Sequence, residues 1–135
     1  MLAMPLIHLG GIHEFKTPHQ VPGFVDWVMG NRTDIPELPK IIDTRQWMMP
    51  EAPVLDEASN DYRFVILLEN KQWGLAVNEL IGSETIESSQ VRWRSQPGKR
   101  PWLAGMIKER MCALIHYQAL SELFQTGTTV DGLSL

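Results

Sequence analysis

Glycine and proline are spaced so densely along this chain that long helices have little room to form. The 135 residues include 10 Gly and 9 Pro, about one such residue in every seven positions. Proline fixes φ and removes a backbone donor, and glycine favours turns, so both interrupt helices. Short strands fit between such interruptions. The sequence therefore predicts a mostly-β domain made of small hairpins.

Composition places the chain among ordinary globular domains and excludes several other classes. It is 44% hydrophobic and 21% charged, with a net charge of −4, which argues against disorder and against a nucleic-acid-binding domain. A single cysteine, Cys112, excludes an internal disulfide framework and a cysteine-rich zinc site. The longest apolar run, Phe64 to Leu68, is far below the roughly 20 residues that a membrane span needs. The N-terminus lacks the basic start of a secretory signal, so we expect a cytoplasmic protein without direct membrane insertion.

The expected elements are short strands and two short helices. Asp43 and Gln46 have the spacing of a capping box, which predicts a helix after Asp43. An amphipathic pattern predicts a second helix over 117–125. Gly10–Gly11 and Gly30 are expected to end the strands before them. The strands are expected at residues 4–9, 24–29, 40–42, 62–68, 72–80, 102–107 and 111–116, with 85–86 extending the sheet and one helical turn over 87–91.

No arrangement of residues in the sequence predicts catalysis, a metal site or a cofactor. His8 and His13, together with Glu14, contain metal-ligating groups but match no recognised ligand spacing. Cys112 and His116 would point to the same face of a strand, but roughly 13 Å apart, too far for a nucleophile–base pair. Cys112 lies in an apolar run, so a buried, inert thiol is the better interpretation.

The most unusual stretch of the chain is Arg92 to Trp102, which reads RWRSQPGKRPW. Basic residues interleaved with tryptophans are typical of surfaces that bind single-stranded nucleic acid. The same residue types are favoured in protein–protein contacts. A third interpretation is a solvated hairpin whose arginines stack on its own tryptophans. The sequence leaves these three alternatives open.

A series of sequence blocks resembles CheW-like domains, the adaptor fold of bacterial chemotaxis arrays. Gly30 precedes Asp43 by the thirteen residues that separate the corresponding positions of the family. The other matching blocks, in the family's order, are 9–14 (LGGIHE), 21–24 (VPGF), 41–45 (IIDTR), 73–80 (WGLAVNEL) and 112–117 (CALIHY), followed by Leu120.

The resemblance implies a fold of two intertwined, small SH3-like β-barrels with two short helices, and it implies no catalysis. The adaptor domain would span residues 1–126, followed by a C-terminal tail over 127–135. Because the family usually has a further strand or two at the start, either the first barrel is incomplete and open or the chain is a fragment of a longer protein. An open edge would invite a partner strand or a second copy of the chain as a homodimer.

The partners implied by the resemblance are those of chemotaxis adaptors. They are the regulatory domain of the chemotaxis histidine kinase and the tip of a chemoreceptor, in membrane-associated arrays. With Gly30 and Asp43 aligned, the arginine that ordinary adaptors use near the receptor groove falls on Ile35. Only a remodelled loop would let Arg32 replace it. This divergence favours a subclass such as the CheW-like domain of the polar organiser ParP, which links the kinase to a ParA-like ATPase.

Five residues are predicted as exposed partner contacts at the barrel ends and the groove. Four of them combine apolar or aromatic character with positions at loops and turns, and the fifth, Arg32, is the possible replacement for the family's arginine. The residues are Trp27, Arg32, Ile35, Trp93 and Trp102.

Overall fold

The apolar run at 64–68 forms an inner strand of a five-stranded sheet in the computed structural model of the chain. Strand β5 (Phe64–Leu68) and strand β6 (Trp73–Val77) make an antiparallel hairpin whose turn places Lys71 at a φ of 58°. The structure describes residues 2–20, 25–48, 61–94, 100–109 and 112–126. It divides into two compact units, Leu9–Ile81 and Met1–His8 with Gly82–Leu135.

The Leu9–Ile81 unit is built on the strand order β2-β5-β6-β4-β3. Its remaining elements are β2 (Leu9–Glu14), β3 (Val28–Asn31), β4 (Lys40–Asp43) and the short helix α1 (Thr44–Met48). Strand β4 is parallel to β6, and the other neighbours are antiparallel. The inward side chains form one apolar cluster: Ile35, Ile41, Tyr62, Val65, Leu67 and Ala76.

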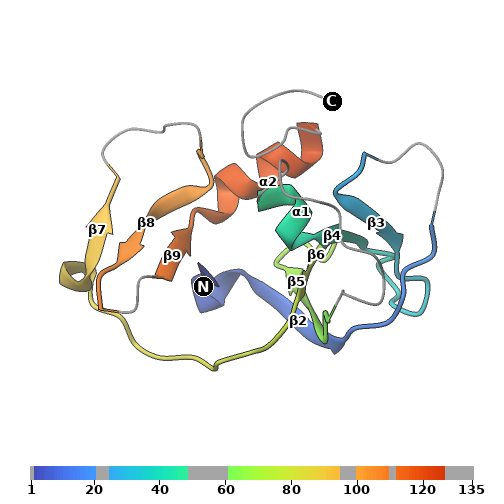
Figure 1. The fold of residues 1–135 in the computed structure, drawn as a ribbon, viewed down its shortest axis with the longest axis horizontal. Coiled ribbons are helices and arrows are strands. Elements are labelled where there is room, and N and C mark those ends of the chain that lie inside the picture. The colour runs from blue at the N-terminus through green and yellow to red at the C-terminus, as the bar shows by residue number, and fades with distance from the viewer. Residues whose placement is uncertain (1, 21–24, 49–60, 95–99, 110–111, 127–135) are drawn as a thin grey trace. The chain divides into compact units, whose positions relative to one another are not determined.

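The other unit combines the start of the chain with its second half, so the two units are intertwined in sequence. Its sheet has the order β1-β9-β8-β7, and β1 (Leu2–Ala3) is parallel to β9 (Cys112–Ile115). Figure 1 shows this N-terminal segment in blue beside the orange-red β9. The remaining elements are η1 (Leu6–His8), η3 (Ser88–Gln90), β7 (Val91–Trp93), β8 (Leu103–Ile107) and helix α2 (Tyr117–Thr126).

Each helix is capped at its N-terminus by the side chain of the residue that precedes it. The Gln46 backbone N–H donates to Asp43 Oδ1 at 3.2 Å, which confirms the predicted cap of α1. At α2 the Ala119 N–H donates to His116 Nδ1 at 3.2 Å, so a histidine acts as the N-cap. The apolar stripe of α2 buries Leu120 and Phe124. The core of this unit contains Val91, Ile107 and Cys112, in agreement with the predicted burial of the thiol.

The structure contradicts two predictions about glycine. Gly10 and Gly11 lie inside β2, and Gly30 lies inside β3; an irregular register marks both places. A Cβ on Gly10 would collide with the Leu68 carbonyl oxygen of the neighbouring strand. Gly30 has a φ of 140°, and a Cβ added to it would collide with the His19 carbonyl oxygen. These glycines permit bulges and close backbone approach rather than ending strands.

Three further expectations about strands were wrong. Residues 6–8 form a 3-10 turn rather than a strand, and residues 85–86 lie outside the sheet. Strand β7 occupies the start of the Arg92–Trp102 stretch, where no strand was predicted. The predicted tail over 127–135 lies outside the described residues. Within the described residues, an isolated β-bridge pairs His19 with Asn31 and connects the segment after β2 to β3.

Candidate docking loop

The loop between β3 and β4, residues 32–39, alternates between buried anchors and exposed tips. Arg32 and Ile35 are 3% and 2% exposed, and Pro39 is fully buried. Pro36, Glu37 and Leu38 are exposed. A backbone hydrogen bond of 3.0 Å from Arg32 N–H to the Pro39 carbonyl closes the base of the loop. The loop is therefore fixed at three points and presents a short exposed segment between the last two.

Arg32 holds the loop through its guanidinium group. Its Nε and Nη2 donate to the two carboxylate oxygens of Asp34 at 2.7 and 2.8 Å. Its Nη1 donates to the Glu14 carbonyl at 3.0 Å, which ties the loop to the end of β2. Three hydrogen bonds from one buried, charged group fix the position of that group closely. Arg32 is thus engaged inside the protein.

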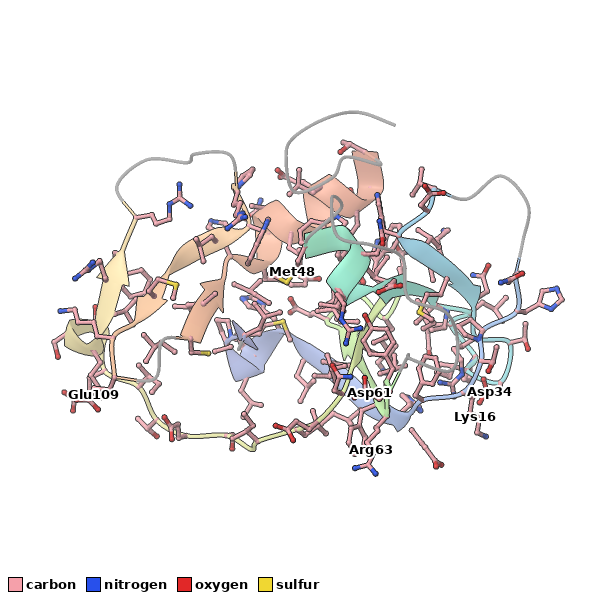
Figure 2. All side chains as sticks on the ribbon, viewed as in Figure 1. Lys16, Asp34, Met48, Asp61, Arg63 and Glu109 are labelled. Carbon is pink, nitrogen blue, oxygen red and sulfur yellow. The ribbon has the colours of Figure 1, made fainter. Side chains whose placement is uncertain are left out.

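The same pairing controls the charge of Asp34. The hydrogen bonds from Arg32 hold the pKa of the Asp34 carboxyl well below its usual range. Lys16 and Asp34, both labelled in Figure 2, lie close together, with Lys16 Nζ 3.8 Å from the carboxylate. Asp34 remains about half exposed, so it stays ionised and contributes negative charge to the surface of the loop.

Ile35 is the apolar anchor of the loop. It belongs to the core cluster of this unit, where it packs with Ile41 and Val65 among others. Its carbonyl accepts a 2.9 Å hydrogen bond from the Leu38 N–H, which forms the tight turn at the tip. The Asn31 side-chain amide donates to the Leu38 carbonyl at 3.0 Å. The backbone on both sides of the tip is therefore satisfied and ordered.

Leu38 has the most unusual conformation in the loop. Its φ is 51°, in the left-handed region, which costs a non-glycine residue about 1–2 kcal/mol. Leu38 is nevertheless 55% exposed, so packing of its side chain offsets little of this backbone strain. Strained, non-glycine backbone that persists in an ordered setting is concentrated at functional positions. The loop thus presents a pre-organised leucine beside the carboxylate of Glu37.

A second polar cluster surrounds the start of α1 and has a structural role. The Tyr62 hydroxyl donates to Asp43 Oδ1 at 2.5 Å and accepts from the Arg45 N–H at 3.0 Å. Burial and the hydrogen bond to Asp43 raise the pKa of the Tyr62 hydroxyl above its ordinary value. The Asp61 carboxylate accepts from the Asn78 amide and lies 3.7 Å from Arg45 Nη2. This network connects α1 to the hairpin of β5 and β6.

The five predicted contact residues are not all exposed. Trp93 is 54% exposed, as the prediction required. Trp27, Ile35 and Trp102 are each 2% exposed and Arg32 is 3% exposed, so the expectation of exposure is wrong for these four. Large apolar side chains at loop edges complete the cores in this fold. Arg32 is buried because Asp34 and the Glu14 carbonyl satisfy its donors.

The structure brings Arg32 and Ile35 together as anchors of one loop, and it places Trp93 and Trp102 in the other unit. Sequence reasoning missed Leu38, the exposed tip between those anchors. Its only signal is a leucine flanked closely by Pro36 and Pro39. In the described part of the chain, no three His, Cys, Asp or Glu side chains are grouped as metal ligands would be.

Comparison with known proteins identifies the fold. A family model described as the CheW-like domain matches residues 1–124. The crystal structure of the scaffolding protein TtCheW from Thermoanaerobacter tengcongensis superimposes with a TM-score of 0.66 at 14% identity, covering 84% of this chain and 80% of that one. Among curated proteins, none matches the chain. Of the helices in the described residues, none is long and apolar enough to cross a membrane.

The two small β units, intertwined in sequence, have the fold of the matched family. The chain belongs to the CheW-like domain family. Its class is therefore the non-enzymatic chemotaxis adaptor, and the predicted fold of two small β subdomains with two short helices is confirmed.

Proposed function

We propose that this chain is a cytoplasmic adaptor domain that binds the regulatory domain of the chemotaxis histidine kinase. The observation that carries the proposal is the loop of residues 32–39, which holds a strained and exposed Leu38 in place. Membership of the CheW-like family supplies the kind of partner. Recruitment to membrane-associated receptor arrays follows from the same family membership.

Pre-organisation is what makes this loop suitable for docking. Ordering a flexible loop on binding costs conformational entropy and lowers the affinity. A loop that is already fixed in the free protein avoids this cost. Arg32, Ile35 and Pro39 fix the loop before any partner arrives. A leucine at the tip then offers an apolar anchor, and Glu37 and Asp34 offer negative charge beside it. The matching surface on the kinase domain is an apolar pocket with a basic rim.

The kinase is favoured over the receptor tip because of the state of Arg32. The resemblance allowed Arg32 to replace the family's receptor-groove arginine only if the loop were remodelled. The guanidinium group instead donates to Asp34 and to the Glu14 carbonyl and is almost fully buried. Receptor docking in the ordinary mode would need this group at the surface.

Calorimetric titration with the kinase regulatory domain from the same source tests the proposal. We expect saturable binding with a negative heat-capacity change, since burial of apolar surface lowers the heat capacity. Absence of heat at several temperatures, with both proteins folded, would overturn the proposal.

A further inference from the structure

Strand β7 is the outer strand of its sheet and offers unpaired main-chain groups. In its antiparallel pairing with β8, the Arg94 N–H donates to the Ala104 carbonyl and the Lys108 N–H donates to the Gln90 carbonyl. Pairing alternates along an antiparallel ladder, so Arg92 also faces β8, whereas the N–H and carbonyl of Trp93 point away from it. No described residue pairs with these outward groups of Trp93.

The Trp93 side chain is held in an exposed position beside this edge. It is 54% exposed, and its indole N–H donates to the Ser88 carbonyl at 3.1 Å and to Ser88 Oγ at 3.2 Å. Both acceptors lie in the η3 turn just before the strand. The ring is therefore oriented by the protein while most of its apolar surface faces solvent. Exposed tryptophan with a fixed orientation is well suited to act as a binding anchor.

Positive charge is concentrated around the same edge. Six of the twelve lysines and arginines lie between residues 92 and 110, together with one of the sixteen acidic residues, Glu109. In the described part of that stretch, Arg92, Arg94, Arg100 and Lys108 are all exposed. Glu87 in the preceding turn is also exposed, so the cluster remains positive after both carboxylates are counted. The chain as a whole is negative, which makes this basic patch a local feature.

We propose that an acidic, extended segment of a partner protein adds to β7 as a further strand. The strand pattern specifies the partner: Arg92 and Arg94 lie on one face of the ribbon and Trp93 on the other. An added strand with carboxylates at alternate positions pairs with the two arginines. Its intervening residues, best β-branched and apolar, then pack on Trp93. Main-chain hydrogen bonds to Trp93 complete the contact.

A protein strand fits this edge better than single-stranded nucleic acid. Nucleic-acid binding of that kind needs several exposed aromatic rings on which bases stack. Trp102, the second tryptophan of the Arg92–Trp102 stretch, is 2% exposed and offers no such ring. The open main-chain N–H and carbonyl of Trp93, by contrast, match the donors and acceptors of an added strand. This site lies on the other unit from the docking loop, and the proposal does not rest on kinase binding.

The test uses a short peptide of alternating glutamate and valine, titrated into the isotopically labelled full chain and followed by NMR. We expect saturable shifts centred on the Trp93 backbone amide and indole N–H, which weaken as salt rises. A peptide of the same composition with its glutamates and valines in two separate blocks should bind at least about tenfold more weakly, because it cannot satisfy both faces. Equal binding of the two peptides overturns the proposal.

Variants separate the charge from the strand contact. Arg92→Gln with Arg94→Gln should weaken binding about tenfold, since two exposed ion pairs are lost. The matched control, Arg63→Gln with Lys71→Gln, removes the same charge from exposed positions of the other unit and should have no effect. N-methylation of the peptide at the amides that face β7 should abolish binding, because it removes the donors to the Trp93 main chain. A methylated peptide that binds normally, or tighter binding of oligothymidine than of the peptide, contradicts strand addition.

Discussion

Replacing Leu38 with asparagine separates docking from folding, because the two should respond differently. Asparagine tolerates the left-handed region better than leucine does, so the substitution recovers about 1 kcal/mol of backbone strain. The leucine side chain is 55% exposed, and losing its buried part costs roughly 1 kcal/mol. These effects oppose each other. The free energy of unfolding should therefore change by less than about 1 kcal/mol.

Kinase binding should respond more strongly to the same change. A docked partner would cover the exposed half of Leu38, which is worth about 1–1.5 kcal/mol of apolar burial. The dissociation constant should then rise about tenfold in calorimetric titration. Leu80→Asn is the matched control, because Leu80 is 39% exposed in the same unit and lies outside the loop. It should leave the affinity unchanged.

Two results would refute this reasoning. If Leu38→Asn folds normally and binds the kinase domain as tightly as the parent, Leu38 is not an anchor. If urea unfolding shows a loss above about 2 kcal/mol, the leucine has a structural role and its strain does not reflect docking.

Substitutions at three other positions test an anchor of the loop, the cap of α2 and the ion pair of Asp34. Ile35→Ala should destabilise the protein by about 2–4 kcal/mol in urea unfolding, because it opens a cavity in the core cluster; a loss below about 1 kcal/mol would contradict its burial. His116→Ala should cost about 1 kcal/mol in thermal unfolding by removing the cap of α2, and His116→Asn should restore most of it; equal loss in both variants would argue against capping. The folded state lowers the pKa of Asp34, so its contribution to stability is present above about pH 4 and is lost as the pH falls below that value. Asp34→Asn should therefore flatten the decline of stability in acid, and parallel curves for variant and parent would disprove the linkage.

Local sequence signals predicted those elements whose stability depends on nearby residues. The apolar run at 64–68 became β5, and the pattern at 117–125 became α2. The Asp43 cap followed from spacing alone and is present. The glycines were misread because their role depends on distant strands. Gly10 is required because the Leu68 carbonyl of β5 lies where a Cβ would be, and no local pattern in the sequence indicates this contact.

The candidate site was harder to predict for the same reason. Two residues of the loop, Arg32 and Ile35, were selected from the sequence as partner contacts. Arg32 is buried because it reaches the Glu14 carbonyl, eighteen positions earlier in the chain. Ile35 enters a core assembled from four strands and the segments beside them. The positive φ of Leu38 has no signature in the sequence, since leucine rarely adopts it.

Mapping the kinase interface by NMR tests the central claim most directly. The isotopically labelled chain is titrated with the unlabelled regulatory domain, and the amide shifts are assigned along the backbone. The account predicts that the largest changes fall on Glu37 and Leu38 at the tip of the docking loop. It also predicts little change at Trp93 on β7. Kinase binding with its largest shifts on β7, or without any shift in residues 32–39, would contradict the assignment of this loop as the docking site.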